Sequence, residues 1–316
     1  MKKLLLILLF LPILVSAQFG GNLQAYQVKI ASYGATQNAL LSLPDDYTST
    51  SQNYPLIIFL HGYGEVGSTV QDLSRLIKQG LPKVISSGQK VEAVHPVSGQ
   101  RTKFIVLAPQ HHGWTTTPEA IEYMLTDLPK KFRIDTNRIY LTGLSAGGQG
   151  VIQAVTFKES LTKKIAAIVP MSPSAPSDDY MKNFRFFSGG YPAAWFFTGD
   201  NDQVTPPANA RRYSDSINRY NQGGGTVTIY SGGHDGWANI YDSSYRVNGR
   251  NWLEWLLMHP HPGGPPVIDP KPVPKYTTIL HDKSRINKII VLDLDGKVTL
   301  YDSTSVESEG IKLEFK

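Results

Sequence analysis

The stretch LTGLSAGGQG, residues 141–150, places Ser145 between Gly143 and Gly147. A serine in the pattern Gly-x-Ser-x-Gly can act as a nucleophile that attacks a carbonyl carbon and forms a covalent acyl intermediate. With 28 glycines in 316 residues, about 0.2 such matches arise from composition alone, so the pattern needs support from its surroundings.

A serine hydroxyl is a weak nucleophile at neutral pH and needs a base, which is most often histidine. The chain has 8 histidines. His259 and His261 lie in a proline-rich stretch, His281 in the C-terminal tail and His95 in a polar insertion. His234 differs from these, because SGGHDGWANIY follows the last apolar run of the main region and precedes its last helical run. This position predicts the base, and a solvated loop histidine is the alternative.

The base needs an acid that orients its ring and stabilises the imidazolium. The apolar run AAWFF is followed by TGDNDQVTPP, which offers Asp200 and Asp202. We favour Asp202, because the second acid of such a loop usually takes this role. The resulting chain order is Ser145, Asp202, His234, which is the order of α/β-hydrolases and differs from that of trypsin-like and subtilisin-like enzymes.

The glycine-rich turn LHGYGE, residues 60–65, follows another apolar run. A backbone N–H in such a turn can point into a site and stabilise a developing oxyanion. We predict that the N–H groups of Tyr63 and of Ala146, the residue after the nucleophile, form this oxyanion hole. His61 heads the turn, which favours a structural hydrogen-bonding role for it over that of a base.

Apolar runs alternate with helical stretches along the chain. Most of these runs are apolar throughout, as in parallel strands that are covered on both faces. The pattern predicts an α/β fold with a mostly parallel central sheet and helices on both faces. Ser145 directly follows one predicted strand and precedes a helix rich in small residues, which is the setting of a nucleophile elbow. The predicted parallel strands are 55–60, 104–108, 138–142, 165–171, 193–198 and 226–230; the predicted helices are 69–79, 118–132, 148–158, 207–220 and 249–258; an antiparallel pair, 25–31 and 38–42, is expected at one edge.

The ends of the chain differ from this central region. Residues 1–17, MKKLLLILLFLPILVSA, have the charge, apolar core and small residues of a cleavable secretory signal, with cleavage after Ala17. The apolar run is shorter than a membrane span needs, so an uncleaved anchor is the less favoured reading. A catalytic domain is expected over 18–258, and the chain is expected to be secreted or periplasmic.

Residues 259–275 contain seven prolines in seventeen residues, which predicts an extended linker. Beyond it, 276–316 is expected to form a short β segment, with strands 288–294 and 297–301 flanking Asp295-Gly296 and a third strand at 311–315. This tail either docks on the main domain or begins a module of a longer chain.

Composition narrows the possible partners. The formal charge is +5, of which Lys2 and Lys3 contribute two, and the other basic residues are scattered among acidic ones. No patch for nucleic acid or for a membrane surface is predicted. The chain has no cysteine, so burial alone must stabilise it, and no Cys/His cluster indicates a metal or another cofactor.

The motifs HGYGE, VLAPQ, DTNRIYLTGLSAGG, GDNDQVTP and GGHDGW together resemble the carbohydrate esterase family that contains feruloyl and acetylxylan esterases. That family is related to proteins similar to polyhydroxybutyrate depolymerases and dienelactone hydrolases. The resemblance covers roughly residues 35–258, and Ala146 replaces a methionine that such proteins often carry. The segments 88–103 and 178–190 fit it less well, which limits what it says about specificity.

The resemblance implies a serine esterase that acts through an acyl-enzyme. Its substrates would be small esters or acetyl or feruloyl groups on polysaccharide. The candidate substrate contacts are His111, Trp114 and Trp237. For His111 and Trp114, a position in a loop without any contact to substrate is equally supported. The alternatives are a peptidase of the prolyl-oligopeptidase type and a carbohydrate-binding protein that keeps the hydrolase fold without catalysis.

Overall fold

The computed structural model describes residues 19–30, 35–261, 288–292 and 298–302. The chain forms two compact units, Met1–Gly264 and Pro265–Lys316. The predicted leader lies outside the described residues, as do nearly all of the predicted linker, the Asp295-Gly296 turn and the third tail strand. Among the residues that the structure describes, no helix combines the length and the apolar character needed to cross a membrane.

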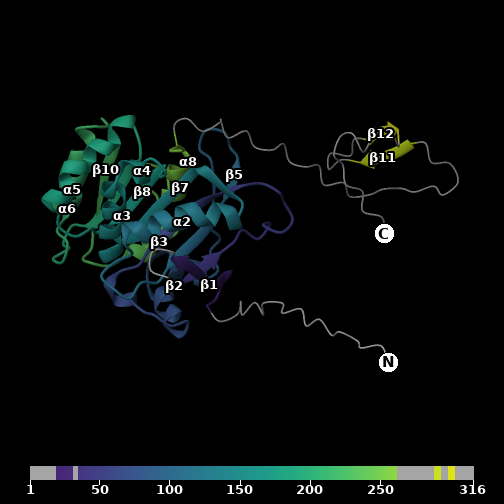
Figure 1. Cartoon of the computed structure of the whole chain (residues 1–316). Coiled ribbons are helices and arrows are strands. Elements are labelled where there is room, and N and C mark those ends of the chain that lie inside the picture. The colour runs from purple at the N-terminus through teal and green to yellow at the C-terminus, as the bar shows by residue number, and fades with distance from the viewer. Residues whose placement is uncertain (1–18, 31–34, 262–287, 293–297, 303–316) are drawn as a thin grey trace, which may run out of the picture. The chain divides into compact units, whose positions relative to one another are not determined.

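An eight-stranded sheet forms the centre of the first unit, with the strand order β1-β2-β6-β3-β7-β8-β9-β10 (Figure 1). The first two strands pair antiparallel at one edge and β2 pairs antiparallel with β6, whereas the neighbours from β6 to β10 are parallel. This arrangement confirms the predicted mostly parallel sheet with an antiparallel pair at its edge. The strands are β1 (Leu23–Ile30), β2 (Ala35–Ser42), β3 (Tyr54–Leu60), β6 (Ile105–Pro109), β7 (Ile134–Leu144), β8 (Ala167–Met171), β9 (Ala193–Gly199) and β10 (Gly225–Tyr230).

Both faces of the sheet are buried, which explains why its strands are apolar without alternation. In β3, Leu56 and Ile58 belong to one hydrophobic cluster, and Ile57 and Phe59 belong to a second cluster. Successive side chains of a strand point to opposite faces, so the two clusters are the two sides of the sheet. Burying a large aliphatic side chain contributes about 1.5–3 kcal/mol, and each central strand makes this contribution on both sides.

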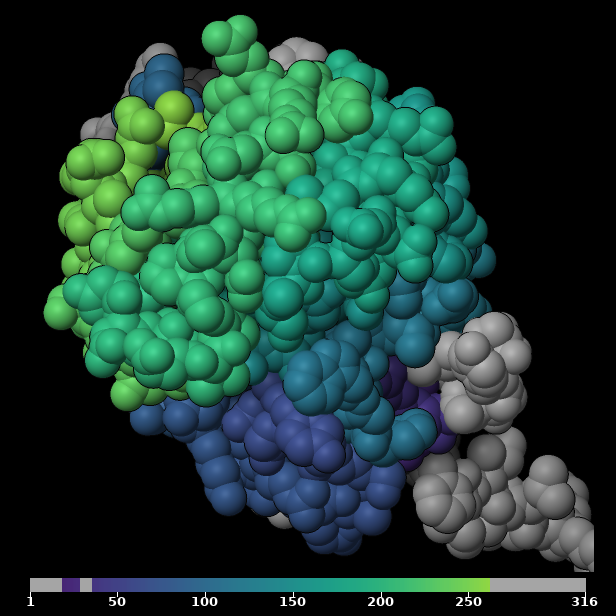
Figure 2. Space-filling model, turned by 90° about the vertical axis from the view of Figure 1, so that its left-hand side faces the viewer, coloured from purple at the N-terminus to yellow at the C-terminus, as the bar shows by residue number. Residues whose placement is uncertain are grey.

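Helices supply the covering layers. Residues of α2, α3, α6 and η4 join the first cluster, and residues of η3, α1, α7 and α8 join the second. Figure 2 views the molecule from the side of α5 and α6 and shows the green part of the chain above the blue part, with the teal part beside it. The helices are α1 (Gly80–Ser86), α2 (Pro118–Lys131), α3 (Ala146–Phe157), α4 (Glu159–Thr162), α5 (Asp178–Met181), α6 (Pro207–Asn218), α7 (Trp237–Tyr241) and α8 (Trp252–Leu257), with 3-10 helices η2 (Tyr63–Glu65), η3 (Gln71–Lys78) and η4 (Lys182–Gly189).

Local signals explain where two of these helices begin. The Thr117 side chain accepts a hydrogen bond from the Ala120 N–H, and a proline occupies the first helical position of α2. Helix α8 begins with a capping box between Asn251 and Glu254. The helix predicted from residue 249 begins three residues later, and the helix predicted at 69–79 is a 3-10 helix, Gln71–Lys78.

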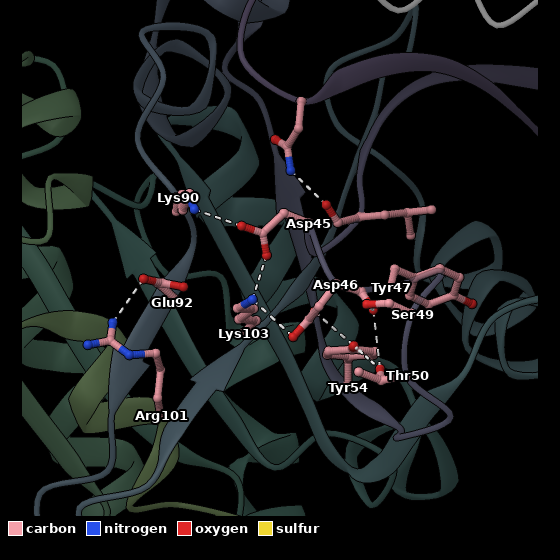
Figure 3. A network of polar contacts seen from close by, with 12 residues as sticks. Asp45, Asp46, Tyr47, Ser49, Thr50, Tyr54, Lys90, Glu92, Arg101 and Lys103 are labelled. Carbon is pink, nitrogen blue, oxygen red and sulfur yellow. Dashed lines mark hydrogen bonds and ion pairs between the residues drawn. The ribbon is translucent and has the colours of Figure 1, made fainter. Parts of the chain in front are cut away.

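The polar insertion at 88–103 folds as a hairpin of β4 (Glu92–Val94) and β5 (Arg101–Lys103). An ion-pair network ties it to the loop after β2 (Figure 3). Lys90 lies 2.7 Å from the Asp45 carboxylate, and Lys103 contacts both Asp45 and, at 2.9 Å, Asp46. Hydrogen bonds from Lys103 and Lys90 hold the pKa of Asp45 well below its usual value.

We expect Asp45→Asn to loosen this hairpin while leaving global stability almost intact. Surface ion pairs contribute roughly 0–1 kcal/mol, and the Asp45 side chain is 47% exposed. Amide hydrogen exchange in β4 and β5 should accelerate several-fold, with little change in melting temperature. Asp179→Asn, which breaks an exposed pair with Lys182, is the matched control. Equal exchange rates in wild type and Asp45→Asn would show that the network does not anchor the hairpin.

The second unit contains β11 (Lys288–Leu292) and β12 (Val298–Asp302), which pair antiparallel. These strands agree with the predicted pair to within two residues at each end.

Candidate active site

A strained turn presents Ser145 at the end of β7. Its backbone has φ 52° and ψ −118°, a conformation that non-glycine residues rarely adopt. Strand β7 ends at Leu144 and helix α3 begins at Ala146, so Ser145 alone makes the turn. The Ser145 N–H donates to the Met171 carbonyl at 2.9 Å, which fixes the turn to the end of the neighbouring strand β8.

Close backbone contacts require the two glycines of the motif. A Cβ on Gly147 would lie 2.0 Å from the Leu60 carbonyl oxygen, and one on Gly143 would lie 2.7 Å from the carbonyl carbon of Gly147. No side chain fits at such distances. The glycines therefore let the loop after β3 pass directly beside the turn that carries Ser145.

The structure brings Ser145, Asp202 and His234 together, although 89 residues separate the serine from the histidine. The His234 Nε2 lies 2.9 Å from the Ser145 Oγ, and the His234 Nδ1 lies 2.8 Å from an Asp202 carboxylate oxygen. Each of these side chains follows the carboxyl end of a strand, on the loops after β7, β9 and β10. In a parallel sheet these ends share one edge, which explains the convergence.

Asp202 is buried, and its surroundings favour the ionised carboxylate. Burial by itself raises its pKa, but hydrogen bonds from the Thr205 N–H, from His234 and from the Thr205 hydroxyl outweigh this effect, so the pKa lies below the usual value. The rival Asp200 is exposed and accepts a hydrogen bond from the Gly232 N–H at 3.0 Å. Of the two acids, Asp202 is the one that contacts the histidine.

Three residues that the sequence reasoning did not single out hold this arrangement in place. The Thr205 hydroxyl donates to Asp202 at 2.8 Å and lies 3.2 Å from the His234 Nδ1. The Tyr230 hydroxyl donates to the Asp235 carbonyl at 2.7 Å, which fixes the loop around His234. Ser172 has φ 44° and accepts a hydrogen bond from the Trp237 indole. A threonine three residues after the acid was the one visible signal, because hydroxyls at this spacing often bond a preceding aspartate.

Trp237 occupies a different place from the one expected of a substrate contact. It is only 6% exposed, and its ring meets the His234 ring edge-on with centroids 4.9 Å apart. This burial indicates that Trp237 positions the histidine.

His61 and His111 form a buried stacked pair, with ring centroids 3.7 Å apart. The His61 Nδ1 contacts the Gly62 carbonyl at 2.6 Å, and its Nε2 accepts the His111 N–H at 3.1 Å, which fixes a neutral tautomer. These contacts fit the structural role predicted for His61. His111 is 5% exposed, which favours the plain loop residue over the substrate contact, the two roles left open for it by the sequence.

The predicted oxyanion loop lies beside Ser145. A Cβ on Gly62 would be 2.8 Å from Leu144, the residue before the serine. Tyr63 and Ala146 are the first residues of η2 and α3, and the first N–H groups of a helix have no acceptor in the preceding turn. Tyr63 and Trp114 are 59% and 53% exposed, and their ring centroids are 5.3 Å apart.

Among the described residues, no group of three or more histidine, aspartate or glutamate side chains is arranged to hold a metal ion. The residues that the structure brings together are a serine, a histidine and a carboxylate, the side-chain types of an acyl-transfer triad.

Comparisons with known proteins support the fold. No protein-family model matches the chain, and no curated protein matches it. A thermostable esterase of known structure is 23% identical, with a TM-score of 0.50, over 75% of this chain and 63% of that chain. A ferulic acid esterase is 15% identical (TM-score 0.48, 76% and 99% covered), and dipeptidyl peptidase 4 of Porphyromonas gingivalis is 14% identical (0.48, 76% and 36%).

The chain thus spans less than two thirds of the thermostable esterase. At this identity the likeness concerns the fold alone. Together with the sheet order and the covered faces, it identifies the first unit as an α/β-hydrolase fold, as the sequence predicts.

Proposed function

We propose that the protein is a serine hydrolase that cleaves carboxylic esters. The observation that carries this proposal is the continuous chain of contacts from the Ser145 Oγ through the His234 ring to Asp202, with spacings of 2.9 and 2.8 Å. A hydroxyl on a strained turn, in contact with a histidine that a buried carboxylate orients, is the arrangement that activates serine.

The mechanism follows from these contacts. His234 Nε2 takes the hydroxyl proton as Ser145 attacks the ester carbonyl, and Asp202 stabilises the resulting imidazolium. The N–H groups of Tyr63 and Ala146 stabilise the oxyanion. His234 then gives its proton to the leaving alcohol, and a water molecule repeats the sequence to release the acid.

The proposed substrates are acetyl or feruloyl esters of polysaccharide, encountered outside the cytoplasm. The motif resemblance supports the acyl groups, and the leader-like residues 1–17 support export. Hydrolysis of 4-nitrophenyl acetate, methyl ferulate and acetylated xylan tests the proposal, with acetate and ferulate quantified. Activity on none of the three would refute it. Export predicts a secreted protein that begins at Gln18.

A peptidase of the prolyl-oligopeptidase type is the second candidate, since it shares the residue set and the fold class. Aminoacyl and dipeptidyl 4-nitroanilides distinguish the two, because an esterase of the proposed kind leaves these amides intact. A carbohydrate-binding protein without catalysis would be inactive in every assay and would not react with a fluorophosphonate.

Thr205→Val should lower kcat about tenfold. The change removes the hydroxyl that donates to Asp202. One hydrogen bond to a charged group contributes about 1.5–3 kcal/mol. We expect part of this free energy to appear as a higher activation barrier, because Asp202 then orients His234 less firmly. Steady-state hydrolysis of 4-nitrophenyl acetate measures the effect. Thr198→Val is the matched control, because the Thr198 hydroxyl is buried without a hydrogen-bond partner among the described residues. Equal losses in both variants would mean that the contact to Asp202 is not the cause.

Trp114→Ala should raise KM for methyl ferulate or acetylated oligosaccharide about tenfold with little change in stability. Trp114 is more than half exposed and its ring lies beside the tilted Tyr63 ring, so its removal takes contact area from the substrate and little from the core. Tyr220→Ala removes another exposed aromatic ring and should leave KM unchanged. An unaltered KM in Trp114→Ala would exclude Trp114 from the binding surface.

A further inference from the structure

A cavity of about 460 Å³ lies against the loop that carries His234. Ser231 and Asp235, which stand on either side of the histidine in the chain, both line it. The proposed mechanism uses none of its side chains. The lining residues with polar side chains are Tyr230, Ser231, Asp235, Asn239 and Tyr245.

The wall of the cavity is fixed by Tyr230. The Tyr230 hydroxyl donates to the Asp235 carbonyl at 2.7 Å. A Cβ on Gly232 or Gly236 would lie 3.3 or 3.5 Å from the edge of the Tyr230 ring, so the ring packs closely under both glycines. The cavity is therefore a preformed feature of the histidine loop, as small-molecule sites usually are.

Most of the polar side chains around the cavity face solvent and are free to contact a ligand. Ser231, Asp235 and Asn239 are exposed and Tyr245 is partly buried, and their side chains make no hydrogen bond to another described residue, in contrast to the Tyr230 hydroxyl. Acceptors and donors that are left open in a preformed cavity can bind the hydroxyl groups of a ligand.

The lining restricts the class of ligand. It contains one carboxylate and no lysine or arginine, which disfavours phosphates and acidic sugars. A fatty acyl chain would cover the polar groups of Asp235 and Asn239 without forming hydrogen bonds to them, and burying polar groups in this way costs free energy. Burial raises the pKa of Tyr230 to about 12 and also that of Tyr245, so both rings remain neutral surfaces for stacking. Neutral rings beside open donors and acceptors suit a neutral sugar.

We propose that this cavity binds a neutral sugar unit on the alcohol side of the ester that Ser145 attacks. The proposal rests on the esterase function for its catalytic consequence, but sugar binding itself can be measured without catalysis. It assigns Asn239 and Tyr245 to specificity, since Asn239 lies in α7 and Tyr245 follows this helix, and neither side chain forms a hydrogen bond with the triad.

The test compares kcat/KM for an acetylated methyl xyloside with that for 4-nitrophenyl acetate, which has no sugar. In Tyr245→Phe and Asn239→Leu, we expect the ratio of the two values to fall about five- to tenfold, because each change removes hydrogen bonds that only the sugar can use. Tyr220→Phe and Asp215→Asn alter exposed residues elsewhere and should keep the wild-type ratio. A wild-type ratio in both cavity variants would overturn the proposal.

Binding to Ser145→Ala separates this proposal from the esterase function. Xylotetraose should shift the NMR signals of residues 230–245 in this variant, and Tyr245→Phe should weaken the binding. Such binding in a protein whose wild type hydrolyses no ester would refute the esterase and keep the sugar site. Ester hydrolysis by the wild type without any binding of xylotetraose to Ser145→Ala would refute the sugar site and keep the esterase function.

An amine ligand is the competing outcome, because a carboxylate beside phenol rings can also bind a cation. In that case Asp235→Asn would lower activity on a glycine ester about a hundredfold and leave the ratio for the sugar ester unchanged. For a neutral sugar, Asp235→Asn keeps hydrogen-bonding capacity, and the loss is small on both substrates. A hundredfold loss on the glycine ester alone would show that the ligand is an amine and would overturn the sugar proposal.

Discussion

Ser145→Ala should lower kcat for 4-nitrophenyl acetate by about 10⁴-fold or more. The variant lacks the nucleophile that contacts His234 at 2.9 Å, and removal of the serine from such a triad costs several orders of magnitude. A residual rate above that in water should remain, because the backbone N–H groups near Ser145 are still present. Steady-state kinetics with highly purified protein measure both the loss in kcat and the residual rate.

Labelling with a fluorophosphonate provides the second readout for Ser145→Ala. Wild type should react with one equivalent of the probe, and the variant should not react. Ser216→Ala is the matched control, because Ser216 is a buried serine on α6 whose hydroxyl donates to the Arg212 carbonyl. Wild-type activity or labelling in Ser145→Ala would show that another residue is the nucleophile and would end the proposed mechanism.

The sequence was sufficient to predict the residues that meet at this site, because each follows an apolar run that becomes a parallel strand. Asp202 and His234 come from the loops after β9 and β10, and Ser145 comes from the turn after β7. Parallel strands place such loops at one edge, so the chain order and the strand pattern together imply proximity. The distances and the strained φ of Ser145 could not be predicted, since they depend on packing against Leu60 and Met171.

The parts that the sequence did not reveal depend on long-range contacts. Helix α1 contains Pro82 and begins at a glycine with φ 61°, so its composition gives little helical signal, yet four of its apolar side chains are buried. By contrast, the sequence predicts the two tail strands, because Asp295-Gly296 is a local turn signal that needs no long-range contact. Burial of Trp237 and His111 was also missed, because an aromatic residue in a loop motif has the same letter whether it faces a substrate or the core.

Acidification should destabilise the fold strongly through His61 and His111. Burial, reinforced by the neighbouring His111, lowers the pKa of His61 to about 3, and burial lowers that of His111 to about 4. Both rings are neutral in the folded protein, whereas the unfolded chain takes up protons near pH 6.5. The free energy of unfolding is therefore largest above pH 6.5 and decreases as the pH falls. Between pH 6.5 and about 5, the decrease is about 1.6 kcal/mol for each histidine.

Urea unfolding at pH 8, 6.5 and 5 measures this decrease, and His111→Phe tests its source. Phenylalanine keeps an aromatic ring against His61 but cannot be protonated, so the share of the pH-dependent loss that comes from His111 should disappear, even if the variant is less stable at pH 8. Burial also lowers the pKa of His259, whose share of the loss remains in this variant. His112→Phe changes an exposed neighbour and should keep the full loss. Burial raises the pKa of Glu65, which acts in the opposite sense and is the same in all variants. An unchanged pH dependence in His111→Phe would therefore place the acid sensitivity elsewhere in the fold.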